Sequence, residues 1–210
     1  MKWRADDNER SRLEQALFDE VVDAGYANAS IDRICRRADL PREAFERQFE
    51  DLEDAYCAVI DIERHRLLER LLPAFASATT WRAQMRAVSY AMLDFIEEDR
   101  SWGRFMFVEV FAAGDRAQLI REEGVQVMAG LIDQGRRELD NDCGLSRATA
   151  EAIAGSIFNQ IRGALEADIP ALELTPHLMF NVIVPYLGTK IALEESKIPP
   201  PPRLRRAATH

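Results

Sequence analysis

Apolar residues recur every three or four positions along most of the chain, and this spacing predicts α-helices throughout. The first helix is expected over residues 9–24, and Gly25 follows as a helix-ending glycine. Ser30 is placed to cap a short second helix, and residues 39–41 make the turn to a third at about 42–49. A longer helix followed by two short ones across a tight turn is a helix-turn-helix.

The same spacing continues to near the C-terminus. The further predicted helices cover residues 52–72, stopped or kinked by Pro73; 81–98, capped by Thr79 or Thr80; 101–113, ended by Gly114; 115–137; 146–166; and a last one with Pro176 in its first turn. The proline run after Ile198 predicts an extended, disordered tail over 197–210. The expected fold class is therefore all-α, with a three-helix domain over 7–67 and a bundle of about six helices over 74–196.

The composition is that of an ordinary globular protein, with 47% hydrophobic and 30% charged residues. The charged start of the chain lacks the apolar segment of a signal peptide. Its most apolar stretches, such as 105–113 and 179–187, are far shorter than the roughly 20 residues of a membrane span. We therefore expect a soluble, cytoplasmic protein that does not enter a membrane.

No arrangement of residues in the chain points to catalysis or to metal binding. Its three cysteines and three histidines are scattered, without the paired spacing of a zinc site. The sequence also lacks a glycine-rich phosphate loop, a G-x-S-x-G elbow and an H-E-x-x-H helix. We expect no enzyme activity, no metal and no cofactor.

Residues 12–56 resemble the N-terminal domain of the tetracycline-repressor (TetR) family of transcription regulators. The positions that carry the resemblance, at matching spacing and without a gap, are Leu13, Ala16, Leu17, Phe18, Gly25, Tyr26, Ala29, Ser30, Ile34, Ala38, Leu40, Phe45, Arg47, Phe49 and Glu53. The resemblance implies a DNA-binding helix-turn-helix over about 30–49, followed by a domain that binds a ligand and forms a homodimer.

The chain departs from the family pattern where the family contacts DNA. The departures are Asp39 for a turn glycine, Pro41 for a serine cap, Glu43 for a common glycine, Ala44 and Glu46 for a threonine and a tyrosine that commonly contact phosphate, and Leu52 for a phosphate-binding lysine. An aspartate at position 39 still tolerates a left-handed turn. The fold is therefore expected to survive while several phosphate contacts are lost.

The local charge around this motif is acidic. Residues 30–56 contain five arginines and eight acidic residues, a net charge of −3, in a chain whose net charge is −9. Because phosphate neutralisation supplies most non-specific affinity, we expect weak DNA binding with a shallow salt dependence. The residues expected at the DNA are Ser30, Arg33, Arg36, Arg37, Arg42, Glu46, Arg47 and Gln48.

Two interpretations of the third helix remain open. Arg42 with Glu46, and Glu43 with Arg47, stand four residues apart and can form ion pairs on a solvated helix face. Alternatively, an arginine reads a guanine edge while a glutamate accepts from cytosine N4.

The second half of the chain offers an apolar site and a pairing surface. The side chains expected around a hydrophobic or aromatic small molecule are Met85, Met92, Phe95, Trp102, Phe105, Met106, Met128 and Phe158, with Asn159 and Arg162 as polar anchors. Glu109, a carboxylate in an apolar run, is expected to pair with Arg104 or Arg162, or else to hold a polar ligand group. The helix at 146–166 is rich in small residues and, with residues 176–190, is expected to form the dimer interface that the family resemblance implies.

These features together predict a homodimeric, ligand-responsive transcription regulator, expected to be a repressor, that binds a pseudo-palindromic operator in double-stranded DNA. The alternative is a TetR-like protein that has lost direct DNA recognition and acts as a ligand- or protein-binding module.

Overall fold

The structure, a computed structural model, describes residues 8–138 and 145–199, and within these ranges the regular elements are all helical. The all-α prediction is therefore confirmed. Residues 200–210 of the predicted tail lie outside the described residues.

The N-terminal unit consists of α1 (Glu9–Ala24), the 3-10 turn η1 (Tyr26–Asn28), α2 (Ile31–Ala38) and α3 (Arg42–Glu46). Asn8 caps α1 by accepting the backbone N–H groups of Arg10 and Ser11. Gly25 ends the helix with φ of 79°, a value that an L side chain rarely adopts. The predicted start and end of the first helix are both confirmed.

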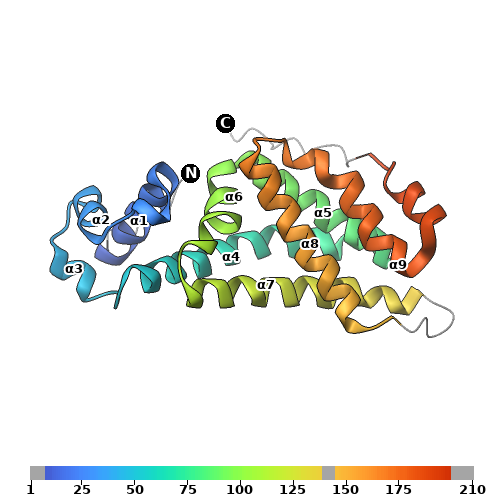
Figure 1. Cartoon of the computed structure of the whole chain (residues 1–210), viewed down its shortest axis with the longest axis horizontal. Helices are drawn as coiled ribbons and strands as arrows, with labels where there is room; N and C mark the ends of the chain where they lie inside the picture. Colours follow the sequence, from blue (N-terminus) through green and yellow to red (C-terminus); the bar gives the residue numbers. More distant parts are fainter. Residues whose placement is uncertain (1–7, 139–144, 200–210) are drawn as a thin grey trace.

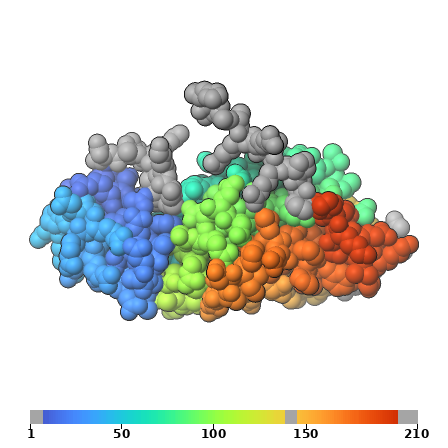
Figure 2. All heavy atoms as spheres, turned by 90° about the horizontal axis from the view of Figure 1, so that it is seen from above, coloured from blue at the N-terminus to red at the C-terminus, as the bar shows by residue number. Residues whose placement is uncertain are grey.

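α4 (Leu52–Ala76) is the long element that joins the two halves of the molecule. Figure 1 shows α1–α3 at one end of an elongated chain and α4 running from them into the remaining helices. Its first turns are buried, with Tyr56 and Val59 fully covered by neighbouring side chains. Figure 2 shows the N-terminal unit against the region of α6, and α1 is the helix that makes this contact.

The second half is a helical bundle around the core formed by α4 and its neighbours. Its elements are α5 (Trp81–Glu98), α6 (Arg100–Phe107), η2 (Glu109–Phe111), α7 (Asp115–Asp133), η3 (Gln134–Glu138), α8 (Arg147–Glu166), η4 (Ala171–Leu174) and α9 (Thr175–Glu195). α5 packs along α4 and α9, while α7 packs along α8. Thr80 caps α5 by accepting the N–H of Ala83, as one of the two predicted alternatives requires.

Several helix ends differ from the sequence prediction. α3 stops at Glu46 because the N–H of Gln48 turns to the carbonyl of Phe45, three residues back, and tightens the last turn. α4 does not end at Pro73: it runs one turn further to Ala76, since a proline removes only one hydrogen bond of the helical ladder.

The apolar run after Ser101 is two elements rather than one helix. Asp99 caps α6 by accepting the N–H of Trp102 at 2.9 Å, and the helix breaks at Val108 before η2. The predicted helix at 115–137 likewise divides into α7 and η3. α9 contains a break at Gly188, whose φ of 76° and ψ of 171° turn the last segment away, as Figure 1 shows at the C-terminal end.

Polar contacts fasten α1–α3 to the bundle. The Glu109 carboxylate accepts the backbone N–H of Tyr26 at 2.8 Å, so the expected pairing of Glu109 with Arg104 or Arg162 is wrong. Arg104 instead donates to the carbonyl of Leu165, and Arg162 pairs with Glu166. These partners are backbone groups and helix neighbours, which side-chain charge alone does not reveal.

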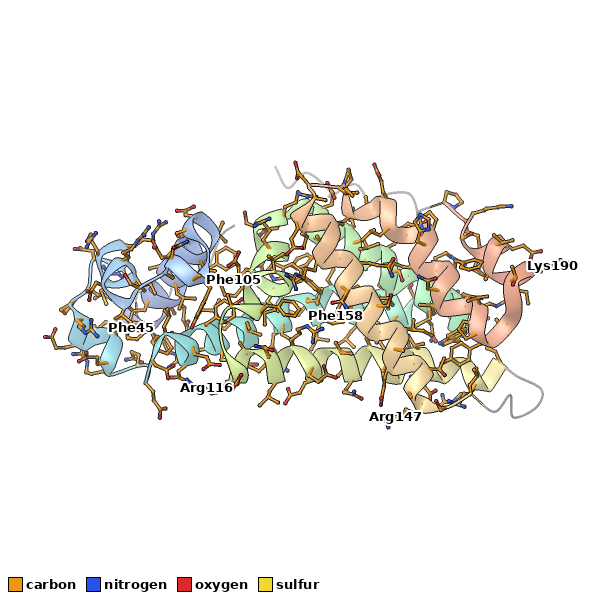
Figure 3. The ribbon with its side chains drawn as sticks, in the orientation of Figure 1. Phe45, Phe105, Arg116, Arg147, Phe158 and Lys190 are labelled. Atoms are coloured by element: carbon orange, nitrogen blue, oxygen red, sulfur yellow. The ribbon has the colours of Figure 1, made fainter. Side chains whose placement is uncertain are left out.

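A second fastening lies where α4 meets α7. Glu53 Oε1 accepts the N–H groups of Arg116 and Ala117 at 2.6 and 3.3 Å and so caps the start of α7. The guanidinium of Arg116, a residue labelled in Figure 3, forms an ion pair with Asp51 on the N-terminal side of α4, at 2.6 Å between Nη2 and Oδ1. The hydroxyl of buried Tyr56 donates to the Phe105 carbonyl at 2.6 Å.

Within the residues described, none of the helices is long and apolar enough to cross a lipid bilayer.

Candidate nucleic-acid interface

A small apolar core fixes the relative placement of α2 and α3. Ile34 and Phe45 are almost fully buried, and the rings of Phe45 and Phe49 lie 5.3 Å apart between centroids. Because Phe45 and Phe49 face inward, as predicted, the side chains of Arg42, Glu46 and their exposed neighbours face outward. Figure 3 places Phe45 at the far end of the molecule from the bundle.

The turn between the two helices has the predicted chemistry. Ser30 Oγ accepts the N–H of Arg33 at 3.4 Å and starts α2. Asp39 adopts a left-handed φ of 52° and closes the helix. Arg12, from α1, donates to the carbonyls of Ala38 and Asp39 and holds this corner in place.

Most of the arginines expected at the DNA are engaged by carboxylates of the same domain. The pairs are Arg33 with Glu20, Arg37 with Glu20 and Asp23, Arg42 with Asp32 and Glu46, and Arg47 with Glu9. The hydrogen bond that Arg37 donates to Asp23 raises the pKa of Arg37, and those that Arg42 donates to Glu46 and Asp32 raise the pKa of Arg42. Each of these four guanidiniums therefore already lies against a carboxylate of its own domain.

Arg36 differs from the other four. It is exposed on α2 and has no carboxylate within ion-pair distance among the described residues. Gln48 lies half-buried just beyond α3, and its carbonyl accepts from Arg10 at 3.4 Å. Arg36 is thus the motif arginine whose charge is most available to an outside partner.

Sequence spacing found only part of this network. The Arg42–Glu46 pair follows from the four-residue interval, and it forms. Glu43 and Arg47, the other such interval, are not paired with each other; Arg47 Nη2 instead lies 2.7 Å from Glu9 Oε2 on α1. Asp32, Glu20 and Glu9 were missed because their partners are distant in the sequence.

The residues expected at a ligand lie in different surroundings. Met85, Met92, Phe95, Trp102 and Phe105 are buried; Met106, Met128 and Phe158 are half-buried; Asn159 is exposed; and Arg162 is half-buried. Phe105 packs against Phe18 and Tyr56, with ring centroids 4.9 and 4.5 Å apart, so it belongs to the junction with α1–α3.

The remaining aromatic residues form a second group deeper in the bundle. Trp102 stacks edge-on against Phe95 at 4.6 Å between centroids, and Phe107 links it to Phe158. Arg162 lies over the ring of Phe111 at 4.3 Å, where it is paired with Glu166 rather than pointing to Asn159. The side chains therefore form a packed aromatic core whose outer edge is cationic.

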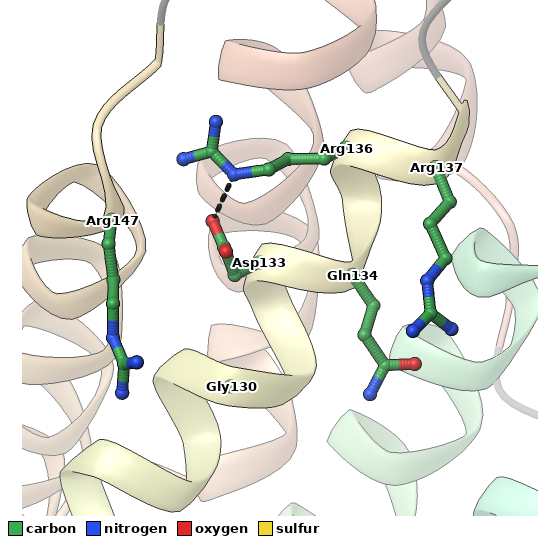
Figure 4. Close-up of a pocket in the computed structure, with 6 residues that line it drawn as sticks. All are labelled: Gly130, Asp133, Gln134, Arg136, Arg137 and Arg147. Atoms are coloured by element: carbon green, nitrogen blue, oxygen red, sulfur yellow. Dashed lines mark hydrogen bonds and ion pairs between the residues drawn. The ribbon is translucent and has the colours of Figure 1, made fainter.

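A pocket of about 510 Å³ lies elsewhere, where α7 ends and α8 begins. It is lined by Gly130, Asp133, Gln134, Arg136, Arg137 and Arg147, none of which was expected to bind a ligand. Figure 4 shows that Arg137 and Arg147 extend on opposite sides of the end of α7, and that Arg136 is paired with Asp133 at 2.7 Å. Its arginines do not converge on one point.

The outer face of α8 is formed by small side chains. Ala152, Ser156 and Gly163 are exposed along one side of the helix. A Cβ added at Gly155 or Gly163 would meet nothing within 4 Å. This face can therefore approach another helix closely without rearrangement of the chain.

No protein-family sequence profile matches the chain. Over 101 residues the chain is 31% identical to a transcriptional activator of the helix-turn-helix type, FasR from Mycolicibacterium smegmatis. The matched stretch covers 48% of this chain and 46% of the relative, so the chain spans about half the length of that protein.

Solved structures match over nearly the whole chain. The fatty acid degradation regulator FadR from Bacillus halodurans has a TM-score of 0.71 at 13% identity and covers 87% of this chain and 97% of its own. FadR from Bacillus subtilis, in complex with stearoyl-CoA, has a TM-score of 0.69 at 12% identity, with coverages of 84% and 97%. A TetR-family regulator from Marinobacter aquaeolei has a TM-score of 0.61 at 17% identity, with coverages of 90% and 96%. The chain has the fold of TetR-type regulators, as its resemblance to that family implied.

Proposed function

We propose that this chain is a DNA-binding transcription regulator of the TetR type. The supporting observation is the helix-turn-helix itself. A capped α2, a left-handed turn at Asp39 and the inward rings of Phe45 and Phe49 leave Arg36, Arg42 and Arg47 exposed on one unit. The 31% identity to a transcriptional activator over 101 residues supports the same role.

Binding of the purified protein to the DNA upstream of its own coding region tests this proposal. Affinity for that duplex is compared with affinity for a scrambled duplex across a salt series, because salt dependence reports the phosphate contacts. We expect a sequence preference with a shallow salt slope. Arg36→Ala should weaken binding, while Arg162→Ala, in the bundle, should leave it unchanged. Equal affinity for both duplexes at low salt would refute the proposal.

A homodimer is part of this proposal, with α8 and α9 as the paired helices. Two helix-turn-helix units would then face half-sites about 34–36 Å apart on a pseudo-palindrome. Gly155→Leu on the open face of α8 should convert the dimer into monomer, because the new side chain occupies the space of the partner helix. Gly130→Leu, at a glycine of α7 that is equally free of neighbours, is the matched control. A monomer mass for the unmodified protein at micromolar concentration would reject the dimer.

We also propose that the bundle binds an apolar molecule, whose chain would separate the packed side chains of Trp102, Phe95 and the methionines of α5. The supporting observation is the fold shared with a regulator solved in complex with stearoyl-CoA. Stearoyl-CoA is therefore the first probe, and free CoA without the acyl chain is its control. A ligand that binds the folded state raises the unfolding temperature, so we expect a rise with stearoyl-CoA and none with free CoA. An equal rise with both compounds, or with neither, would count against an acyl-chain ligand.

The competing function is a ligand- or protein-binding module that no longer reads DNA. The ion pairs that already neutralise Arg33, Arg37, Arg42 and Arg47 favour it. The same DNA titration decides between the two functions, because only the regulator discriminates between the duplexes.

A further inference from the structure

Arg42, the first residue of α3, is held from two sides by carboxylates. Its Nη1 lies 2.8 Å from Asp32 Oδ1 on α2, and its Nε lies 2.9 Å from Glu46 Oε1, one turn further along α3. The three side chains are 53%, 69% and 57% exposed, in the order Arg42, Asp32 and Glu46. A single cation at the start of the exposed helix is therefore surrounded by two anions.

These contacts add little to the stability of the fold. Exposed ion pairs contribute less than about 1 kcal/mol each, and often nothing measurable. They instead occupy hydrogen-bond donors of Arg42, because its Nε and Nη1 already have carboxylate acceptors. Bidentate recognition of a guanine edge or a phosphate uses two adjacent donors of this planar group. A bidentate acceptor on DNA must therefore compete with Glu46 for Nε or with Asp32 for Nη1.

Displacement also leaves a carboxylate next to the DNA. Glu46 stays on α3 when its contact with Arg42 breaks, and its charge then faces the phosphate backbone. The ion pair therefore opposes DNA binding in two ways: it occupies the Arg42 cation, and once broken it leaves the Glu46 anion to repel the duplex.

We propose that Asp32 and Glu46 compete with DNA for Arg42 and thereby hold the operator affinity of this domain below what its fold can give. The acceptor that Arg42 takes on DNA is a guanine edge or a phosphate oxygen. This inference rests on the proposed function and concerns how that same surface is tuned.

Three neutralising substitutions separate this competition from a general change of charge. Glu46→Gln and Asp32→Asn each remove one competitor of Arg42. Glu43→Gln makes the same change of charge on the same short helix, at an exposed residue without an ion-pair partner among the described residues. Circular dichroism and unfolding midpoints establish that all three variants fold alike.

Affinities are measured by fluorescence anisotropy with the duplex that the protein prefers. We expect Glu46→Gln and Asp32→Asn to tighten binding about tenfold, the effect of one well-formed arginine contact. Glu43→Gln should tighten it by no more than about threefold, since a screened exposed charge acts only over a short range. In an Arg42→Ala background the advantage of Glu46→Gln over Glu43→Gln should disappear.

The outcomes are distinct. If the unmodified protein prefers one duplex and Glu46→Gln and Asp32→Asn exceed Glu43→Gln, the competition is supported. A salt slope that steepens by about one ion then assigns a phosphate as the acceptor. A gain confined to duplexes with one particular guanine assigns a base edge. If a duplex is preferred but the three variants bind equally, the competition is wrong and the proposed function stands. If no variant prefers any duplex, both are overturned.

Discussion

The carboxylate of Glu109 accepts the backbone N–H of Tyr26 at 2.8 Å and so joins two segments 83 residues apart in the sequence. Tyr26 follows the glycine that ends α1, whereas Glu109 begins the 3-10 turn after α6. A peptide N–H at a partly buried junction needs an acceptor, and the structure supplies it from the other half of the molecule. This contact and the capping of α7 by Glu53 make the two halves depend on each other.

Removal of the Glu109 carboxylate should therefore destabilise the protein. Glu109→Ala leaves the Tyr26 N–H without its acceptor, and we expect a loss of about 1–2 kcal/mol in the free energy of unfolding. Urea denaturation at a fixed protein concentration measures it. Glu109→Gln keeps an acceptor oxygen and should lose less than half as much. Equal losses for the two variants would show that the hydrogen bond to Tyr26 is not the cause.

Gly114 should not tolerate a side chain. Its φ is 117°, and an added Cβ would lie 2.5 Å from the carboxyl group of Glu53. Gly114→Ala combines backbone strain with displacement of the group that caps α7, so we expect a loss of about 2–3 kcal/mol. Gly130→Ala, within α7 and free of neighbours within 4 Å, should instead gain up to about 1 kcal/mol from helix propensity. Thermal unfolding of the two variants should move in opposite directions.

The hydroxyl of Tyr56 is a third test of the junction. Tyr56 is fully buried, and its hydroxyl donates to the Phe105 carbonyl at 2.6 Å. Tyr56→Phe should cost about 1–2 kcal/mol because the buried carbonyl loses its donor. Tyr90→Phe, whose hydroxyl donates to the carbonyl of Ile198 nearer the surface, is the comparison and should cost less. A larger loss for Tyr90→Phe would contradict this ranking.

Glu63 should make stability depend on pH. Burial raises the pKa of this fully covered carboxyl above its ordinary value of 4.5, and the ion pair with Arg66 at 2.6 Å opposes the rise only in part. Between 4.5 and the raised pKa the folded state binds more protons than the unfolded state. The contribution of Glu63 to stability is therefore fully present below that window and is lost as pH rises through it.

The comparison with Glu63→Gln isolates this contribution. The difference in unfolding free energy, wild type minus variant, should fall as pH rises through the window and then level off. Denaturant unfolding at a series of pH values measures the slope. A difference that stays constant or increases with pH would show that burial does not govern this carboxyl.

The sequence predicted helix ends correctly where a capping residue close by in the chain determines them. α1 ends where Gly25 predicted, and α5 begins at Thr80, one of the two predicted caps, because a cap acts over three or four residues. The inward positions of Phe45 and Phe49 followed from the same periodicity. The break after Phe107 was missed because the apolar run continues through Val108 to Phe111 and no glycine or proline marks it.

The candidate site was less predictable because its charges are paired across the fold. The partner of the Glu109 carboxylate is a backbone N–H donor, that of Tyr26, which no side-chain pattern shows. Arg47 pairs with Glu9, 38 residues away, and not with Glu43, four residues away. The packing of α1 against α3 determines which carboxylate lies nearest to it. A count of charges detects the acidic balance of the motif but not which arginine each acid holds.

The occupied arginines have a consequence for how such a protein would be distributed in a cell. A genome offers about 10⁶–10⁹ non-specific sites, and a domain rich in free cations spends most of its time on them. Here Arg33, Arg37, Arg42 and Arg47 already face carboxylates, so random DNA would meet few unmatched cations on this surface. A regulator built this way would leave more of its copies unbound by bulk DNA, although the ion pairs of Arg42 also lower its affinity for the operator.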